Sequence, residues 1–158
     1  MSRKTSFERF VMDNMDSCYR FAYSYAKNKE DAEDILNESM LKGWKSVGDL
    51  REERFMKTWF YKIISNTAIT YLRKKGTYIA LEDDALERLG TYEDEYDYSS
   101  FDDMIRILPE KYKEVIVLRY FEDMSIAEVA TVLDLNENTV KTRIHRALKI
   151  LKIDMEKE

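Results

Sequence analysis

The residues that form sharp turns are scarce in this chain, which has one proline and four glycines among 158 residues. Strand-rich folds need many turns, and proline and glycine supply most of them. Hydrophobic residues make up 44% of the chain, enough for a core, and charged residues make up 36%. We therefore expect an all-α fold, built as one ordinary domain or as two small ones.

The sequence contains no segment that would direct the chain to a membrane or to an oxidising compartment. No apolar run reaches the roughly 18 residues that a transmembrane helix needs, and the first ten residues lack the apolar stretch of a signal peptide. A single cysteine, Cys18, cannot form an internal disulfide, which also favours the cytoplasm. Cys18 falls on an apolar helical stripe, so we expect a buried structural thiol rather than a redox group.

The formal net charge of −5 is unevenly distributed along the chain. Residues 1–75 carry 15 basic and 11 acidic side chains, residues 76–103 carry 1 and 10, and residues 104–158 carry 10 of each. Like charges at the density of the middle block repel one another and hinder compaction. We therefore predict two small helical domains, at 1–75 and 104–158, joined by a flexible acidic linker at 76–103 with room for a short helix over 84–89.

Three helices are expected in the first domain. The spacing of apolar residues predicts helices over 6–27 and 28–47, residues 48–53 are typical of a loop, and residues 54–75 are apolar around most of the helix circumference. The last of these helices should therefore lie centrally in its domain. The expected apolar face of the second helix consists of Ala32, Ile35, Leu36, Met40, Trp44 and Val47, and the polar stripe of the third consists of Thr58, Lys62, Ser65, Asn66 and Arg73.

The second domain contains the pattern of a helix-turn-helix. Ser125 and Glu128 have the spacing of a capping box, in which each side chain satisfies a backbone N–H of the other residue. This box opens a short helix over 125–133, which is followed by a three-residue turn at 134–136 and a basic helix over 136–152. A capped helix, a tight turn and a basic helix in this order indicate a DNA-binding unit.

The basic helix is expected to have one apolar side, packed on residues 125–133, and one polar side. The apolar side consists of Val140, Ile144, Ala147, Leu148 and Leu151, and the polar side consists of Asn138, Lys141, Thr142, His145, Arg146 and Lys149, with Arg143 at the flank. Long cations, a hydroxyl and an imidazole reach base edges and phosphates in the major groove of B-DNA. The plainer interpretation is a solvated charged face, but such a face normally mixes signs, and no carboxylate occurs from 138 to 153.

The residues of an enzyme or of a metal site are absent from the sequence. Structural zinc takes four Cys or His ligands, whereas this chain has one cysteine and one histidine, His145. No serine or cysteine has a recognisable histidine partner, and the sequence has no Walker loop, GxGxxG or HExxH motif. We therefore expect no catalytic activity, no metal, no cofactor and no small-molecule substrate.

Three segments together resemble a known family, the extracytoplasmic-function (group 4) sigma factors of the bacterial sigma-70 family. The stretch DAEDILNESMLKGW resembles the core-binding part of region 2, and TWFYKIISNTAITYLRKK resembles its promoter-opening part. The stretch LPEKYKEVIVLRYFEDMSIAEVATVLDLNENTVKTRIHRA resembles region 4. The resemblance covers about residues 5–75 and 101–155. It implies two helical domains, and a protein that binds core RNA polymerase, directs it to promoters and helps to open the DNA.

The resemblance also implies roles for individual residues. Contact with the clamp helices of the largest polymerase subunit would fall to Asp34, Asn37, Glu38 and Leu41. Recognition of the minus-10 element, with one base flipped into a pocket, would fall to Leu50, Lys62, Asn66, Arg73 and Lys74. Recognition of the minus-35 element would fall to Asn138, Lys141, Thr142, Arg143, His145, Arg146 and Lys149, with Arg143 facing a phosphate or a carboxylate of the protein itself.

The chain departs from the family pattern at a few positions. Asp134 and Asn138 stand where glycine is frequent, and both residue types tolerate a positive φ better than most. Asn37 stands where glutamine is usual. In the family the linker passes into the RNA exit path of the polymerase, which suits the acidic segment at 76–103, although a solubilising tether would have the same composition.

The family further implies the flap region of the polymerase and promoter DNA as partners, and an anti-sigma factor, often membrane-bound, that would hold the cytoplasmic protein at the membrane. Two other functions remain open from the residues alone. One is a helix-turn-helix DNA-binding regulator that acts without core polymerase. The other is a structural adaptor held by a partner helix.

Overall fold

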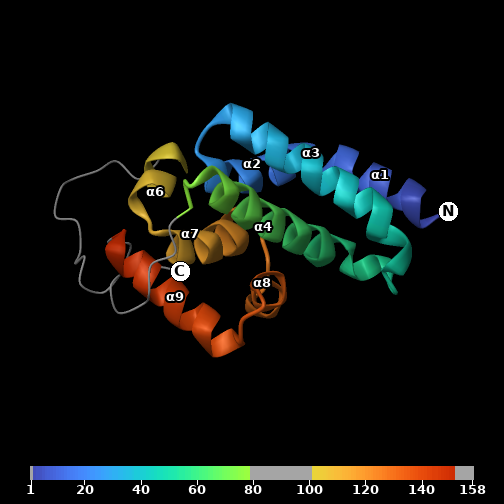
Figure 1. The fold of residues 1–158 in the computed structure, drawn as a ribbon. Coiled ribbons are helices and arrows are strands. Elements are labelled where there is room, and N and C mark those ends of the chain that lie inside the picture. Colours follow the sequence, from blue (N-terminus) through green and yellow to red (C-terminus); the bar gives the residue numbers. More distant parts are fainter. Residues whose placement is uncertain (1, 79–100, 152–158) are drawn as a thin grey trace. The chain divides into compact units, whose positions relative to one another are not determined.

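A computed structural model describes residues 2–78 and 101–151 of the chain (Figure 1). The described residues form helices and turns with no strand, which confirms the all-α prediction, and they divide into two compact units. No helix in these ranges is long and apolar enough to cross a membrane. The short helix predicted over 84–89 and most of the predicted acidic linker lie outside the described residues.

The prediction of one continuous helix over 6–27 is wrong, because the chain forms two helices there. These are α1 (Arg3–Asp13) and α2 (Met15–Ala26), which are separated at Asn14 with φ −119° and ψ 20°. The Asn14 side chain donates a hydrogen bond to the carbonyl of Phe10 at 2.8 Å. Asparagine side chains compete in this way with the helical hydrogen bonds of the backbone. Cys18 in α2 is fully buried, as predicted.

Helix α3 (Lys29–Ser46) begins where predicted. Asn28 caps it by accepting a hydrogen bond from the N–H of Asp31 at 2.8 Å. Of the predicted apolar face, Ala32, Ile35, Leu36 and Val47 are buried. Met40 is only half-buried and Trp44 is 36% exposed, so the predicted face is interrupted between Leu36 and Val47.

Helix α4 (Met56–Lys75) is the central helix of the first unit, as predicted. It runs alongside α3 and also packs on α2 (Figure 1). Two members of its predicted polar stripe are buried instead of solvated, because each finds an internal partner. The Ser65 hydroxyl pairs with the Tyr25 hydroxyl at 2.8 Å, and the Thr58 hydroxyl donates to the carbonyl of Phe55 at 3.1 Å.

A polar network joins the end of α4 to the start of α3. The buried carboxylate of Asp31 accepts hydrogen bonds from Lys75 Nζ at 2.7 Å, the Tyr71 hydroxyl at 3.0 Å and Asn28 Nδ2 at 3.0 Å. The same hydroxyl lies 3.0 Å from Asp34 Oδ2. The pKa of Asp31 lies below its ordinary value, first because Lys75 donates to the carboxylate and then because Asn28 does. This network fixes where the basic end of α4 lies on α3.

The second unit begins with α6 (Phe101–Ile107) and α7 (Glu110–Ile116), which continues into a π-helical turn, η3 (Val117–Phe121). Helices α8 (Ile126–Leu133) and α9 (Glu137–Ile150) follow. The predicted capping box is confirmed. Ser125 N–H donates to Glu128 Oε1 at 3.0 Å, and Glu128 N–H donates to Ser125 Oγ at 3.1 Å.

The α1–α3 contact allows a test of the packing. A Cβ added at Gly43 would lie 2.5 Å from Phe7 Cζ, and the Phe7 ring is itself held edge-on against Phe60 with 5.1 Å between centroids. Overpacking costs about 1–3 kcal/mol, and the higher helix propensity of alanine returns about 1. We expect Gly43→Ala to lower the free energy of unfolding by up to about 2 kcal/mol in urea titrations. Gly48→Ala, which meets no atom within 4 Å, should leave it nearly unchanged and is the control.

The Asp31 network allows a second test, which uses pH. Because the folded-state pKa is lowered, the stabilisation by this carboxylate is fully present above the ordinary Asp pKa of about 3.9 and is lost as the pH falls through the lower folded value. We expect Asp31→Asn to destabilise the protein at pH 7 by about 1–3 kcal/mol, and the difference from wild type to shrink below about pH 4. Urea unfolding between pH 7 and pH 3 measures both effects. A difference that stays constant with pH, or an equal effect of Asp16→Asn at an exposed position of α2, would contradict this assignment.

Candidate nucleic-acid interface

The basic helix α9 is oriented by its apolar side. Its N-cap residue, Asn136, accepts a hydrogen bond from the N–H of Thr139 at 2.8 Å. The five residues predicted to form the apolar side are all buried, namely Val140, Ile144, Ala147, Leu148 and Leu151. The backbone of α9 lies against α7, and the expected packing of its apolar side on residues 125–133 stays a prediction. The polar side of α9 is therefore turned away from the core of its unit.

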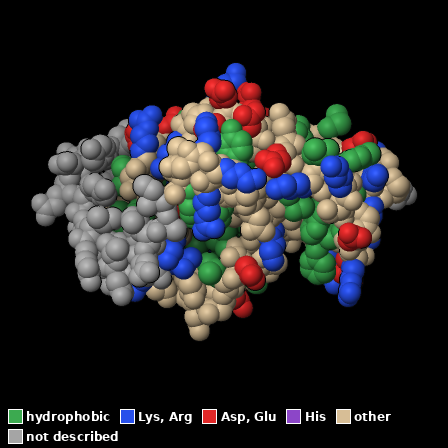
Figure 2. All heavy atoms as spheres, viewed as in Figure 1, with side chains coloured by type: hydrophobic (Ala, Val, Ile, Leu, Met, Phe, Trp, Pro, Cys, Tyr) green, Lys and Arg blue, Asp and Glu red, His purple; other side chains and the backbone are tan. Residues whose placement is uncertain are grey.

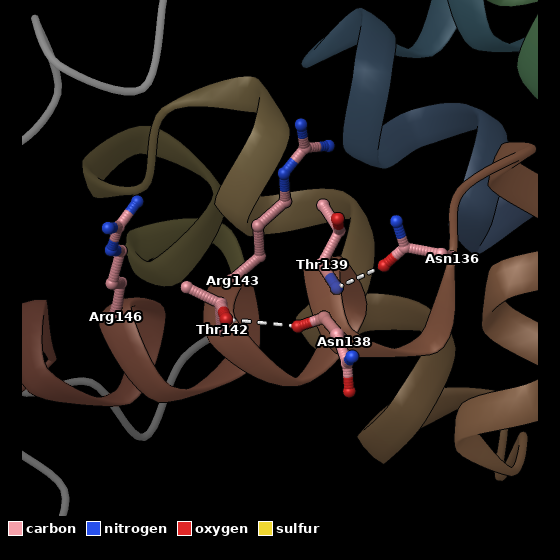
Figure 3. Close-up of a pocket in the computed structure, with 6 residues that line it drawn as sticks. All are labelled: Asn136, Asn138, Thr139, Thr142, Arg143 and Arg146. Carbon is pink, nitrogen blue, oxygen red and sulfur yellow. Dashed lines mark hydrogen bonds between the residues drawn. The ribbon is translucent and has the colours of Figure 1, made fainter.

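Six side chains predicted to face DNA lie on this polar side as expected. Asn138, Lys141, Thr142, His145 and Lys149 are exposed, and Arg146 is half-buried. The flanking Arg143 is also half-buried. Asn138 does not have a positive φ, since it lies inside α9, and the left-handed residue of the turn is Asp134 with φ 56°. The Thr142 hydroxyl donates to the carbonyl of Asn138 at 2.9 Å, which fixes its direction (Figure 3).

A shallow concavity of about 280 Å³ lies over the first two turns of α9. Arg143 and Arg146 extend from successive turns to the same side of the helix (Figure 3). The backbone N–H groups of a helix N-terminus, together with guanidinium groups, attract anions. The concavity is lined by Asn136, Asn138, Thr139, Thr142, Arg143 and Arg146.

The charged side chains of α9 are almost all basic. Acidic and basic side chains are interspersed over the face of the molecule that Figure 2 shows. Ion pairs account for several of the charges in the first unit, including Lys75 with Asp31 at 2.7 Å and Lys29 with Glu33 at 3.8 Å. In α9 the only acidic residue is Glu137, in its first turn. A mixed surface is typical of solvation, whereas a helix with cations alone on its outer side is suited to a polyanion.

The predicted minus-10 residues lie on α4 and on the segment before it. Asn66, Arg73 and Lys74 are exposed, and Lys62 is half-buried. Helical spacing places Lys62, Asn66 and Arg73 on one face of α4, with Lys74 turned away from it. The Arg73 guanidinium lies 5.3 Å from the centre of the Tyr78 ring. Leu50 is half-buried and ends the short turn η1 (Val47–Asp49), which follows α3.

The predicted polymerase-binding residues share one exposed face of α3, namely Asp34, Asn37, Glu38 and Leu41. Glu38 is 3.8 Å from Lys42, and Asp34 receives the hydrogen bond of Tyr71 described above. Leu41 is 54% exposed, which is unusual for a leucine on a helix that packs against α1, α2 and α4. It lies at the edge of an apolar groove of about 540 Å³, whose wall includes Met12, Met40 and Trp44.

One residue near this interface was not found from the sequence. Arg3, in the first turn of α1, holds the segment between α3 and α4 through its side chain. A signal was present, because Arg3 and Lys4 both stand where the helix dipole disfavours cations. Basic residues in the first turn of a helix indicate that another interaction stabilises them there.

The fold is shared with sigma factors of known structure. The Bartonella quintana sigma factor RpoE, solved in complex with the anti-sigma factor NepR, aligns over 94% of this chain and 98% of its own with a TM-score of 0.72 and 20% identity. CnrH, solved in complex with the cytosolic domain of CnrY, aligns over 92% of this chain and 84% of its own with a TM-score of 0.65 and 24% identity. At these identities the likeness shows the fold alone.

Sequence relatives are closer. RNA polymerase sigma factor SigV of Bacillus subtilis is 42% identical over 149 residues, which cover 94% of this chain and 90% of SigV. ECF RNA polymerase sigma factor SigW of the same organism is 31% identical, covering 87% of this chain and 82% of SigW. The ECF RNA polymerase sigma-E factor of Haemophilus influenzae is 33% identical, covering 78% and 74%.

Two protein families match the two described units. Sigma-70 region 2 matches residues 10–77, and Sigma-70 region 4 matches residues 98–151. The family is non-enzymatic, in agreement with the sequence analysis. The chain therefore belongs to the sigma-70 family, as an RNA polymerase sigma factor of the ECF group.

Proposed function

We propose that this sigma factor binds core RNA polymerase through α3, reads a minus-10 element through Leu50 and α4, and reads a minus-35 element through α9. The observation that carries the proposal is the outer side of α9, which is exposed, basic and without acidic residues beyond its first turn. In this proposal residues 1–75 act as region 2, residues 104–158 act as region 4, and the acidic residues 76–103 connect them.

For the minus-35 element, α9 would lie in the major groove. Arginine pairs with guanine through two hydrogen bonds, and the exposed Lys141, Thr142 and His145 can reach base edges or phosphates. Asn138 and Lys149 lie near the two ends of the same exposed side and would contact the backbone. The half-buried Arg143 and Arg146 border the concavity at the start of the helix, where a phosphate would be stabilised by the helix dipole.

For the minus-10 element, a base must leave the stack, which costs a few kcal/mol that the protein has to offset. The exposed amide of Asn66 can donate to and accept from a base edge. Leu50 supplies apolar surface against the base, and Lys62, Arg73 and Lys74 supply charge for the phosphates. These groups suit single-stranded DNA, in which an unpaired base edge can meet the amide while the cations meet the backbone phosphates.

For the polymerase, carboxylates and one exposed leucine on α3 suit the clamp helices of the largest subunit if that surface is basic with an apolar centre. Exposed apolar patches of this kind mark protein interaction sites. The groove beside Leu41 extends the same surface toward α1. We also propose that the second unit binds the flap region of the polymerase. The protein would then act in the cytoplasm, where the polymerase is.

Regulation by an anti-sigma factor is proposed as well. RpoE and CnrH, which share the fold, were solved with NepR and with the cytosolic domain of CnrY. A partner of this class would compete with the polymerase for the exposed face of α3. A membrane-bound one would hold the sigma factor at the membrane. No cofactor and no small-molecule substrate takes part in this scheme.

The test is reconstituted transcription. The protein is mixed with core polymerase and a library of promoter fragments, and specific start sites are mapped. The proposal expects core-dependent initiation at a defined set of promoters, and weak DNA binding by the free protein because few cations are available for phosphate contacts. A DNA-binding regulator would bind specific DNA tightly alone and give no core-dependent initiation, and an adaptor would do neither.

The recognition helix gives one specific prediction. We expect His145→Ala and Arg146→Ala each to reduce transcription from a minus-35-dependent promoter by roughly tenfold, since a base contact or a charged hydrogen bond to a phosphate is worth about 1–3 kcal/mol. Affinity for core polymerase, measured in the same preparations, should not change. Arg106→Ala, which removes an exposed arginine of α6, is the matched control. An equal loss in the control would show that overall charge, and not the face of α9, is responsible.

The exposed face of α3 gives a second specific prediction. Leu41→Ala should weaken holoenzyme assembly by about 1–3 kcal/mol while leaving the unfolding transition in place, because the side chain is exposed until a partner covers it. Titration of the labelled protein with core polymerase measures the affinity. Phe55→Ala removes a larger exposed side chain outside α3 and should leave assembly unchanged. Unchanged affinity in Leu41→Ala would move the polymerase contact away from this face.

A further inference from the structure

The segment between α3 and α4 has little structure of its own. It consists of two short turns, η1 (Val47–Asp49) and η2 (Glu53–Phe55), and most of its residues are exposed. Short-range backbone hydrogen bonds close the turns, among them Leu50 N–H to the carbonyl of Val47 and Phe55 N–H to the carbonyl of Glu52, both at 3.1 Å. Such a segment needs external support if it is to hold one conformation.

Much of the support comes from one side chain of α1, that of Arg3. Arg3 Nε donates to the carbonyl of Leu50 at 3.1 Å, and one terminal nitrogen of the same guanidinium donates to the carbonyl of Arg51 at 2.7 Å. The other terminal nitrogen lies 3.1 Å from Glu53 Oε1. The rigid fork of an arginine thus joins three points on the segment, which the single ammonium of a lysine cannot do in the same geometry.

A second contact from α1 completes the attachment. The Ser6 hydroxyl donates to Glu53 Oε1 at 2.7 Å. The pKa of the Glu53 carboxyl lies below its ordinary value, first because Ser6 donates to the carboxylate and then because Arg3 does. The carboxylate is therefore charged at neutral pH. The segment is therefore held on both sides of Arg51.

Arg3 stands at a position of α1 that is electrostatically unfavourable for a cation. Cations in the first turn of a helix oppose the helix dipole, and α1 has two there and no acidic residue. All three nitrogen groups of the Arg3 guanidinium already have partners within the protein. Arg3 is thus suited to hold the segment in place rather than to contact a DNA phosphate itself. The match to Sigma-70 region 2 begins at residue 10, so it covers neither Arg3 nor Ser6.

We propose that Arg3 is a positioning residue for promoter recognition, which holds the backbone of Leu50 and Arg51 in the conformation that receives the flipped minus-10 base. This inference rests on the minus-10 role proposed for Leu50. A pocket that is ordered before binding discriminates between bases, whereas a mobile segment loses part of the binding free energy to its own ordering and adapts to the wrong base. Arg3 would therefore affect which base is accepted more than how tightly the polymerase is bound.

The experiment uses full-length proteins reconstituted with core polymerase and a promoter library randomised across the minus-10 element. The variants are Arg3→Ala, Arg3→Lys and, as a matched control, Arg9→Ala, an exposed arginine of the same helix. The readout is the ratio of transcription from the preferred base to that from the other bases at each position. Hydrogen exchange of the amides at 50–55 is measured on the same proteins without polymerase.

We expect Arg3→Ala to lower this ratio by at least about fivefold at one or two positions. Fivefold corresponds to the lower end of the range that one mismatched base pair typically costs. The amides at 50–55 should exchange faster, while the affinity for core polymerase and the dependence on the minus-35 element stay within about twofold of wild type. Arg3→Lys should fall in between, and Arg9→Ala should match wild type. Glu53→Gln, which removes the charge opposite Arg3, is the second variant and should change the ratio in the same direction.

Three outcomes would overturn the inference. An unchanged base ratio in both Arg3→Ala and Glu53→Gln would remove any role in promoter recognition. A loss of activity that is equal for all bases would reduce Arg3 to a residue that stabilises the fold. An equal change in Arg9→Ala would assign the effect to charge on α1. The absence of specific transcription from the wild-type protein would instead overturn the proposed function, and this inference with it.

Discussion

The first unit depends on the burial of α4. This helix is apolar around most of its circumference, and its side chains Phe60, Tyr61, Ile64, Ala68 and Leu72 are enclosed by the neighbouring helices. Even its hydroxyl groups are turned inward where an internal partner exists, as at Ser65. One narrow face then remains for solvent, and the cations and the amide proposed to contact DNA all have to lie on it or at the end of the helix. The core therefore selects the surface that α4 presents.

The Asp31 network adds a second constraint, because it fixes the two helices against each other at one end. Its carboxylate ties Lys75 and Tyr71 of α4 to the first turn of α3, and the Tyr71 hydroxyl reaches Asp34 as well. Burial, and then the hydrogen bonds to both carboxylates, raise the pKa of Tyr71, so the hydroxyl remains a donor at any physiological pH. In the proposed function, the network therefore fixes the position of the polymerase-binding residues of α3 relative to the DNA-binding residues of α4.

Periodicity was enough to predict most elements and the two faces of α9, because a helix surface follows directly from spacing. It failed where a local polar contact competed with it. The Asn14 side chain interrupts an otherwise continuous apolar stripe by its hydrogen bond to the backbone. Thr58 and Ser65 are buried because the hydroxyl group of each has one hydrogen-bond partner inside the protein. The wrong prediction at Trp44 has another origin. A helix face can be apolar and still lack a neighbour that covers it, and the Trp44 side chain is only partly covered.

Long-range contacts were the least accessible to sequence reasoning. The packing of α9 on α7 depends on how a π-helical turn and two connections direct the chain, and no pattern in one helix encodes it. The contact of Arg3 with the carbonyls of Leu50 and Arg51 spans 47 and 48 residues and involves backbone acceptors that every residue has. Only the unfavourable position of a cation in the first turn of α1 indicated it.

The negative net charge is compatible with DNA binding once the two units are considered separately. In the first unit, several cations are neutralised by ion pairs and others lie on or next to the α4 face, whereas α9 adds cations with one acidic residue at its start. Each unit alone offers few phosphate contacts, so each should bind DNA weakly at physiological salt. Two weak sites joined by a linker bind tightly only when their spacing matches that of the target. If core polymerase sets this spacing, the protein acquires promoter affinity in the holoenzyme and avoids sequestration on other DNA when it is free.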